Sequence, residues 1–79
     1  MSCYFCGDPN TEIHHLIFGR GLRELSDKYG LVIPLCRDCH EELHHNKVMM
    51  AWSRAEGQRR FEAEHGREAF MRIFGKNYL

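Results

Sequence analysis

Apolar residues in the first half of the chain form two short clusters separated by a more polar stretch. Residues 11–17 alternate in part between polar and β-branched or apolar side chains, which predicts a short strand. Residues 31–35 are almost all apolar and predict a second strand, which Pro34 restricts to a sheet edge or strand end because proline lacks an amide hydrogen. Residues 22–30 are polar with isolated apolar anchors and predict a loop with a helical turn.

The second half of the chain has the residue spacing of helices. Asp38 and Glu41 are three residues apart, as in a capping box, and Asp38 is the expected cap of a helix that starts near Cys39. This helix should run to about His45, and Asn46 is a residue type that often ends a helix.

A longer apolar pattern follows and predicts two further helices. Residues 47–64 have the period of an amphipathic helix, which Gly57 can interrupt. Its apolar positions are Val48, Ala51, Trp52, Ala55, Phe61 and Ala63. The His-Gly pair at residues 65–66 is a stop signal, and residues 67–74 predict a short helix that Gly75 ends. The expected core positions of this last helix are Phe70, Met71, Ile73 and Phe74.

The length of the chain bounds the fold. Its 79 residues predict a single α+β domain over residues 1–79, near the lower limit at which a hydrophobic core alone maintains a fold. Such a small domain is expected to need a cross-link. No apolar run approaches the ~20 residues of a membrane span, so we expect no membrane partner.

Four cysteines can provide the cross-link. Cys3 and Cys6 form one CxxC pair, and Cys36 and Cys39 form another. Two such pairs far apart in sequence favour one structural Zn²⁺ with four thiolate ligands. Two disulfides or an iron site are the alternatives. No signal peptide precedes Cys3, so we expect a reduced, intracellular and cytoplasmic protein.

The net charge gives no support of its own for a nucleic-acid partner, because it is formally zero. Residues 1–46 hold four Lys/Arg and seven Asp/Glu, and residues 47–79 hold seven and four, so the two parts carry −3 and +3. A bound dication would offset the acidic charge of the first part and make its site attractive to a phosphate. The low total charge argues against tight non-specific DNA binding, which needs many phosphate contacts.

Five histidines lie near the cysteine pairs. His14 and His15 are neighbours on the first predicted strand, so their side chains point to opposite faces and should have different roles. His40 and His44 are four apart on a helix, a spacing at which two imidazoles can bind one metal ion, whereas His45 is assigned to the solvated helix face. Either member of the doublet, with His40 and His44, would form an open site for a divalent cation. The other member would be free to act as a general base near neutral pH.

These motifs together resemble a known family. Residues 3–6 (CYFC), 13–16 (IHHL) and 33–40 (IPLCRDCH) are similar to the zinc-containing, four-cysteine branch of the HNH endonucleases. The resemblance covers about residues 3–45 and implies a ββα-metal unit, in which a two-stranded hairpin, a loop and a helix hold one catalytic metal. Residues 47–79 would then form a C-terminal helical extension. The implied activity is metal-dependent hydrolysis of DNA phosphodiester bonds.

The resemblance also implies roles for single residues. His14 matches the first metal ligand of the family and His15 its general base. His40 matches the ligand that directly follows the zinc-binding pair, and His44 matches an additional ligand of the histidine-rich members. The implied catalytic metal is Mg²⁺, Mn²⁺ or Ni²⁺, which would stabilise the charge on the phosphate and the departing 3′-oxygen while His15 activates water.

The segment between the two predicted strands bears on this site in two ways. Arg20 or Arg23, near glycines, could bind the substrate phosphate through the forked guanidinium. The middle asparagine of the family, which orients the general base, should fall at residues 30–31, where this chain has none. Asp27 and Lys28 are the candidate replacements.

Partners and alternatives follow from the same residues. Residues 28–35 and 70–79 are similar to small HNH proteins of phages and prophages, which implies DNA as a partner and membership of a phage packaging or recombination machinery. One metal site per chain implies nicking of one strand by a monomer or weak homodimer.

The alternative function is a non-catalytic zinc-ribbon-like module that binds DNA or protein. A rubredoxin-like iron site is a third interpretation, and neither alternative gives the histidines a role.

Overall fold

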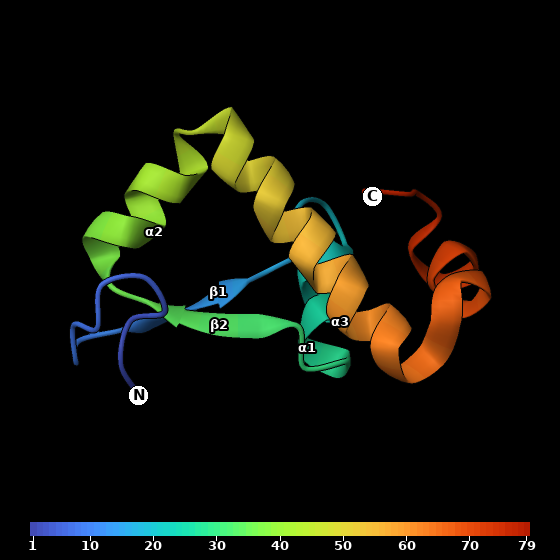
Figure 1. The fold of residues 1–79 in the computed structure, drawn as a ribbon, viewed down its shortest axis with the longest axis horizontal. Coiled ribbons are helices and arrows are strands. Elements are labelled where there is room, and N and C mark those ends of the chain that lie inside the picture. The colour runs from blue at the N-terminus through green and yellow to red at the C-terminus, as the bar shows by residue number, and fades with distance from the viewer.

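The structure, a computed structural model, describes all 79 residues and combines a two-stranded sheet with three helices (Figure 1). In chain order the elements are β1 (Glu12–His15), α1 (Leu22–Lys28), β2 (Val32–Leu35), α2 (Arg37–His44) and α3 (Lys47–Phe74). The helices α2 and α3 meet at an angle and form an arch beside the hairpin of β1 and β2 (Figure 1). The predicted α+β class is therefore confirmed.

The hairpin is antiparallel and places His14 opposite Ile33. Its strands are shorter than the apolar pattern predicts, because Leu16 and Ile17 leave the sheet and become fully buried in the core. The amide of Leu16 still donates to the carbonyl oxygen of Leu31 at 2.9 Å, so the connection between the strands starts from a fixed geometry.

The predicted loop between the strands contains a full helix, α1, and this part of the prediction was too conservative. Leu22 and Leu25 pack against the core, and the hydroxyl of buried Ser26 donates to the carbonyl oxygen of Ile17 at 2.6 Å. These tertiary contacts stabilise a helix whose apolar pattern is too sparse to predict it. Gly30, with φ of 68°, then turns the chain into β2.

The predicted cap of α2 was wrong. Cys36, not Asp38, precedes the helix, and its sulfur accepts a hydrogen bond from the amide of Cys39 at 3.4 Å. Asp38 lies inside the first turn, and the helix starts at Arg37 because the cysteine pair itself provides the cap. Asn46 follows the end of α2, and its side chain accepts hydrogen bonds from two amides of α3, so it acts as the cap of the next helix.

The helix α3 is two helical segments joined at Gly66, where φ is 84° and ψ is 166°. The predicted break at this residue is confirmed, and after it the chain folds back along the core (Figure 1). Gly57 does not interrupt the helix. A Cβ there would lie 2.6 Å from Cγ1 of Ile17, so this glycine allows α3 to approach the end of β1 closely.

The hydrophobic core lies between the hairpin and α3, with Phe61, Phe70 and Phe74 among its largest members. Four positions expected on the buried helix faces are exposed: Val48 is 78% exposed and Met71 38%, and the small side chains of Ala51 and Ala63 are exposed as well. Val48 lies in the first turn of α3, at the bend that joins it to α2. None of the helices has the length and apolar character needed to cross a membrane.

Candidate metal centres and active site

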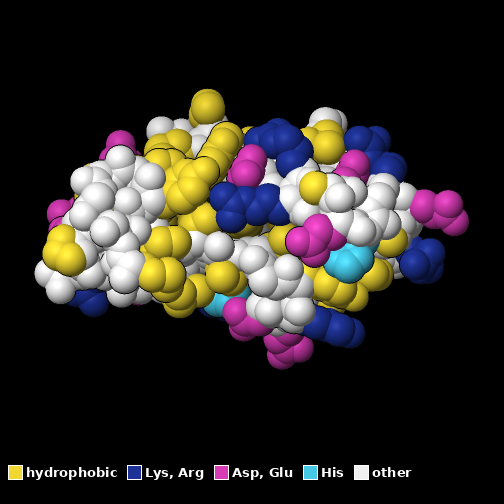
Figure 2. All heavy atoms as spheres, turned by 60° about the horizontal axis from the view of Figure 1, so that its bottom comes forward, with side chains coloured by type: hydrophobic (Ala, Val, Ile, Leu, Met, Phe, Trp, Pro, Cys, Tyr) yellow, Lys and Arg dark blue, Asp and Glu magenta, His cyan; other side chains and the backbone are white.

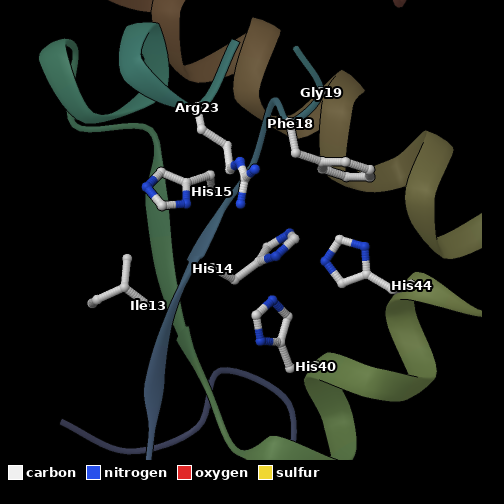
Figure 3. Close-up of a pocket in the computed structure, with 8 residues that line it drawn as sticks. All are labelled: Ile13, His14, His15, Phe18, Gly19, Arg23, His40 and His44. Atoms are coloured by element: carbon white, nitrogen blue, oxygen red, sulfur yellow. The ribbon is translucent and has the colours of Figure 1, made fainter. Parts of the chain in front are cut away.

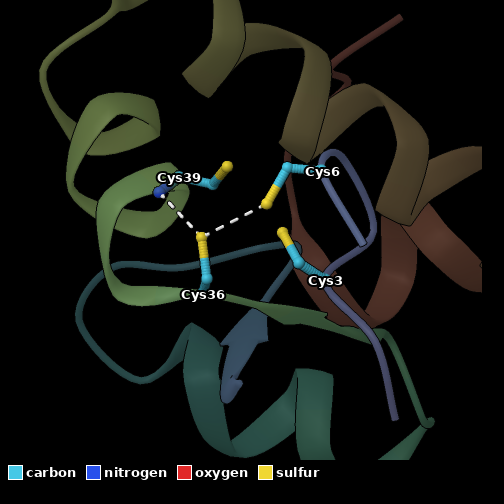
Figure 4. A group of neighbouring side chains, drawn as sticks. All are labelled: Cys3, Cys6, Cys36 and Cys39. Carbon is cyan, nitrogen blue, oxygen red and sulfur yellow. Dashed lines mark hydrogen bonds between the residues drawn. The ribbon is translucent and has the colours of Figure 1, made fainter. Parts of the chain in front are cut away.

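The four cysteines come together in one cluster (Figure 4). Cys3 and Cys6 lie ahead of β1, and Cys36 and Cys39 lie at the start of α2. All four sulfur atoms are within 4.8 Å of one another, and those of Cys6 and Cys36 are 3.6 Å apart. In a tetrahedral site with Zn–S bonds of about 2.3 Å the sulfurs would be about 3.8 Å apart. All four thiols are free, so the cluster can bind a metal ion.

The thiols differ in how readily they ionise. Burial acts to raise the pKa of Cys3, but backbone amides, first that of Cys36, outweigh it and lower this pKa to about 6. Hydrogen bonding to the thiol of Cys36 is the main cause that raises the pKa of Cys39. The amide of Asp8 favours the thiolate of Cys6, but contacts with neighbouring thiols and burial raise its pKa overall. A bound dication would be needed to hold all four as thiolates.

Three histidines form a second cluster. His14 extends from β1, and His40 and His44 extend from α2 towards it (Figure 3). Their ligating nitrogens lie within 4.8 Å of one another. The ring centroids are 5.0 Å apart for His14 and His40, and 4.9 Å apart for His40 and His44. Of the adjacent doublet, His14 joins this cluster and His15 lies outside it. His45, assigned to the solvated face, is exposed and also lies outside it.

His14 is the buried member of the cluster, with 1% of its surface exposed. Burial first, and then the nearby His40 and His44, lower its pKa to about 3. The ring is therefore neutral at neutral pH, which is the form that binds metal. Its Nε2 is 2.8 Å from the hydroxyl oxygen of Ser53 on α3.

The second ring, His40, is oriented by a carboxylate. Its Nδ1 lies 2.8 Å from Oε1 of Glu12, at the start of β1. An ionised carboxylate only accepts, so Nδ1 of His40 donates and Nε2 retains the lone pair for a metal. His44 packs edge-on against Phe18, with ring centroids 4.8 Å apart. The guanidinium of Arg54 lies 4.1 Å from the Phe18 ring centroid and donates to the carbonyl oxygen of Phe18 at 3.3 Å. These contacts hold Phe18 against His44.

His15 is held by a different element. Its Nε2 lies 2.8 Å from Oδ1 of Asp27 on α1, so Nε2 donates and Nδ1 is left as the basic nitrogen. Of the two candidate replacements for the missing asparagine, Asp27 contacts His15, and no hydrogen bond joins Lys28 to it. The helix that was not predicted in full therefore provides the group that orients His15.

A cavity of about 400 Å³ opens beside these rings and is lined by Arg23 as well as by the histidines of β1 and α2 (Figure 3). Arg23 has no carboxylate within salt-bridge distance, and its guanidinium lies over the cavity. Arg20 is exposed and does not line the cavity. Of the two predicted phosphate ligands, the structure brings only Arg23 to the site.

The sequence prediction missed two residues that contact the cluster, Glu12 and Ser53. Glu12 is two residues before His14 on a strand, so the same-face periodicity could have indicated it. Ser53 and Gly57 are four apart on the face of α3 that packs against the end of β1. A small polar residue on a buried helix face is a weak signal, and nothing local pairs it with His14.

Comparisons with known proteins place the chain in a family. The family model described as "Protein of unknown function (DUF968)" matches residues 1–73. The chain belongs to this family. This DUF968 member is also 31% identical, over 62 residues, to a mitochondrial DNA mismatch repair protein mutS homolog of Sarcophyton glaucum. That match covers 67% of this chain and 6% of the longer protein. No solved structure matches the chain.

Proposed function

We propose that this DUF968 member is a divalent-metal-dependent DNA endonuclease of the HNH type. The observation that carries the proposal is the cluster of His14, His40 and His44 beside a fourth histidine, His15, that Asp27 orients. Three protein ligands leave coordination positions open for water and a phosphate oxygen. The matched Sarcophyton glaucum protein is named for DNA mismatch repair, which supports DNA as the substrate class.

The donor set favours some catalytic metals over others. All three ligands are imidazoles, which suit Ni²⁺ better than Mg²⁺, whereas carboxylate and water ligands suit Mg²⁺ and Mn²⁺. Among Mg²⁺, Mn²⁺ and Ni²⁺ we therefore expect Ni²⁺ to bind most tightly. A bound metal supplies Lewis acidity at the phosphate and at the departing 3′-oxygen.

In the proposed reaction His15 is the general base. Its free Nδ1 removes a proton from a water molecule. The Nε2–H group meanwhile stays hydrogen-bonded to the carboxylate of Asp27, which stabilises the imidazolium that forms. The resulting hydroxide forms a bond to the phosphodiester phosphorus, and the bond from phosphorus to the 3′-oxygen breaks. The 5′-phosphate remains on one product, and the departing 3′-oxygen takes a proton from water to become the 3′-hydroxyl of the other. Arg23, unpaired at the cavity wall, binds a non-bridging phosphate oxygen.

The cysteine cluster has a separate role in this proposal. Its four thiolates fit a structural Zn²⁺ and would leave no open coordination position, so this metal does not take part in the reaction. It connects the start of the chain to the start of α2, and Cys39 directly precedes His40. The zinc thus holds one end of the helix that carries two of the catalytic ligands.

A supercoiled-plasmid assay tests the activity. Protein that keeps its zinc but has been stripped of weaker metals should cleave when Ni²⁺, Mn²⁺ or Mg²⁺ is added back. The His15→Ala variant should leave the plasmid intact under conditions in which the wild-type protein cleaves it, because loss of a general base costs about 10²- to 10⁴-fold in rate. The matched control His45→Ala, which changes an exposed histidine outside the cluster, should cleave like the wild type. An intact plasmid with every metal would contradict the proposal.

The order of products tests the number of active sites. A single histidine cluster per chain can cleave one phosphodiester bond at a time, so we expect open circles to accumulate before linear DNA at low protein concentration. Linear DNA from the first time point, with a dimer mass in light scattering, would contradict a nicking monomer.

A non-catalytic DNA- or protein-binding module is the second candidate, and exposed aromatic residues favour it. Apolar side chains gather on one face of the molecule (Figure 2). Tyr4 and Phe5, between the first two cysteines, are 49% and 41% exposed and pack beside Trp52. If the plasmid stays intact while the protein retards labelled DNA in a gel, this candidate replaces the nuclease.

A further inference from the structure

The most deeply buried polar contact of the histidine cluster joins His14 to Ser53. His14 is 1% exposed and Ser53 0%. The hydroxyl oxygen of Ser53 lies 2.8 Å from Nε2 of His14 and 2.7 Å from the carbonyl oxygen of Leu16. These three groups come from the end of β1 and from α3, and no buried side-chain polar atom lacks a partner.

Counting hydrogens determines the direction of both hydrogen bonds. A hydroxyl has one hydrogen, and a carbonyl oxygen can only accept, so Ser53 donates its hydrogen to Leu16. The contact with His14 then requires the hydroxyl oxygen to accept, and Nε2 of His14 must carry the hydrogen. A neutral imidazole has only one such hydrogen, so Nδ1 of His14 retains its lone pair.

We infer that Ser53 is a positioning residue that holds His14 in the Nε2–H tautomer, so that Nδ1 of His14 is its metal-binding atom. The inference rests on the proposed metal centre. His40 is held in the opposite way, because Glu12 accepts from its Nδ1 and leaves Nε2 for the metal. The two rings therefore bind through different nitrogens, each selected by a group on the far side of the ring.

The chain contains a matched control for this role. Ser26 is also 0% exposed, and its hydroxyl donates to the carbonyl oxygen of Ile17, the residue after Leu16, at 2.6 Å. Ser26 forms no hydrogen bond with a histidine. Ser26→Ala and Ser53→Ala thus each remove a buried hydroxyl that satisfies a carbonyl at the end of β1, but only Ser53→Ala removes an acceptor from His14.

Nuclear magnetic resonance tests the tautomer directly in the wild-type protein, with zinc bound and no second metal. Two-bond proton–nitrogen spectra of ¹⁵N-histidine-labelled protein should show His14 as a single Nε2–H tautomer, and His40 as the Nδ1–H tautomer. A His14 ring with its hydrogen on Nδ1, or divided between the two nitrogens, would overturn the inference without any variant.

Calorimetry with Ni²⁺ on the zinc-loaded protein tests the consequence for metal binding. Ser53→Ala should weaken Ni²⁺ binding about 10- to 100-fold, a common cost of losing a group that orients a ligand. Ser26→Ala should leave the affinity within about 2-fold, and Ser53→Thr, which retains a hydroxyl, should recover most of the loss. Equal affinities for Ser53→Ala and Ser26→Ala would overturn the inference.

The two proposals fail in different ways. If wild-type His14 is the Nε2–H tautomer but no Ni²⁺ binds at the cluster, the nuclease proposal fails, and with it the role of Ser53 in metal binding. If Ni²⁺ binds and plasmid is cleaved, but Ser53→Ala changes neither tautomer nor affinity, only the inference about Ser53 fails.

Discussion

The two candidate metal-binding clusters are built in different ways. Each CxxC pair of the cysteine cluster is a local turn, so two ligands arrive together and only the two pairs must meet in space. The histidine cluster takes one ligand from β1 and two from α2. Its ring orientations depend on Glu12 of β1 and Ser53 of α3, and the adjacent His15 depends on Asp27 of α1.

This difference separates stability from chemistry. A closed four-thiolate site contributes to folding, because metal that binds only the folded state stabilises that state. The histidine cluster has a buried neutral ring, and in the proposed function it keeps coordination positions open beside an oriented base. Changes in the first region should therefore affect both regions, whereas changes in the second should alter metal binding or cleavage and leave the fold intact.

The largest expected effect is loss of the fold. Cys36→Ser or Cys39→Ser should unfold the domain, because one removes the cap of α2 and both remove a zinc ligand. A circular-dichroism melt and the zinc content measure this. His44→Ala, which removes an exposed ligand of the other cluster, is the control and should keep the melt near wild type. An unchanged melt for both cysteine variants would show that the thiols do not stabilise the fold.

The next effect separates base from ligand within the histidine region. His15→Ala should reduce cleavage by about 10²- to 10⁴-fold, the usual contribution of a general base, with Ni²⁺ affinity nearly unchanged. His14→Ala and His40→Ala should weaken Ni²⁺ binding because they remove ligands. Plasmid kinetics and calorimetry measure the two quantities. If His15→Ala reduces metal affinity as strongly as His14→Ala, the two roles are reversed.

A smaller effect is expected at the cavity wall. Arg23→Ala should lower kcat/KM by about 10- to 100-fold, equivalent to one hydrogen bond to a charged group of about 1.5–3 kcal/mol. Arg20→Ala removes the same charge from an exposed position that does not line the cavity, and it should change kcat/KM little. Steady-state cleavage of a labelled duplex gives kcat/KM for both variants. An equal loss of kcat/KM in the two variants would show that only the loss of positive charge matters, and not the position of Arg23 at the cavity.

The smallest effect concerns Asp27, whose carboxylate contacts His15. Asp27→Asn should lower kcat by about 10-fold with little change in KM, because Asp27 acts through His15 and not on substrate. Asp27 is exposed, so the melt should not change. The tautomer of His15, read from ¹⁵N spectra, should become mixed in this variant. A pure Nε2–H tautomer with normal kcat would show that Asp27 has no orienting role.

Much of the architecture could be predicted from local patterns. Gly66 divides the last helix as expected, because a positive φ is accessible to glycine and a His-Gly pair marks it. The same-face spacing of His40 and His44 predicted their pairing, which the structure places at ring centroids 4.9 Å apart. The helix α1 was underestimated, because its stability comes from contacts with residues outside it, such as the bond from Ser26 to Ile17.

The sequence by itself determined which residues can bind metal, because the CxxC pairs and the His40–His44 spacing are local geometry. Local spacing left open which member of the His14–His15 doublet joins the cluster, and only the resemblance to the HNH endonucleases assigned His14 to it. In the structure His14 is buried beside the two histidines of α2, whereas His15 lies against Asp27 of α1. The tertiary structure also decided which nitrogen of each ring is free, because the groups that accept the other hydrogen lie on separate elements. Such hydrogen bonds form only when those elements pack, so no local pattern encodes them.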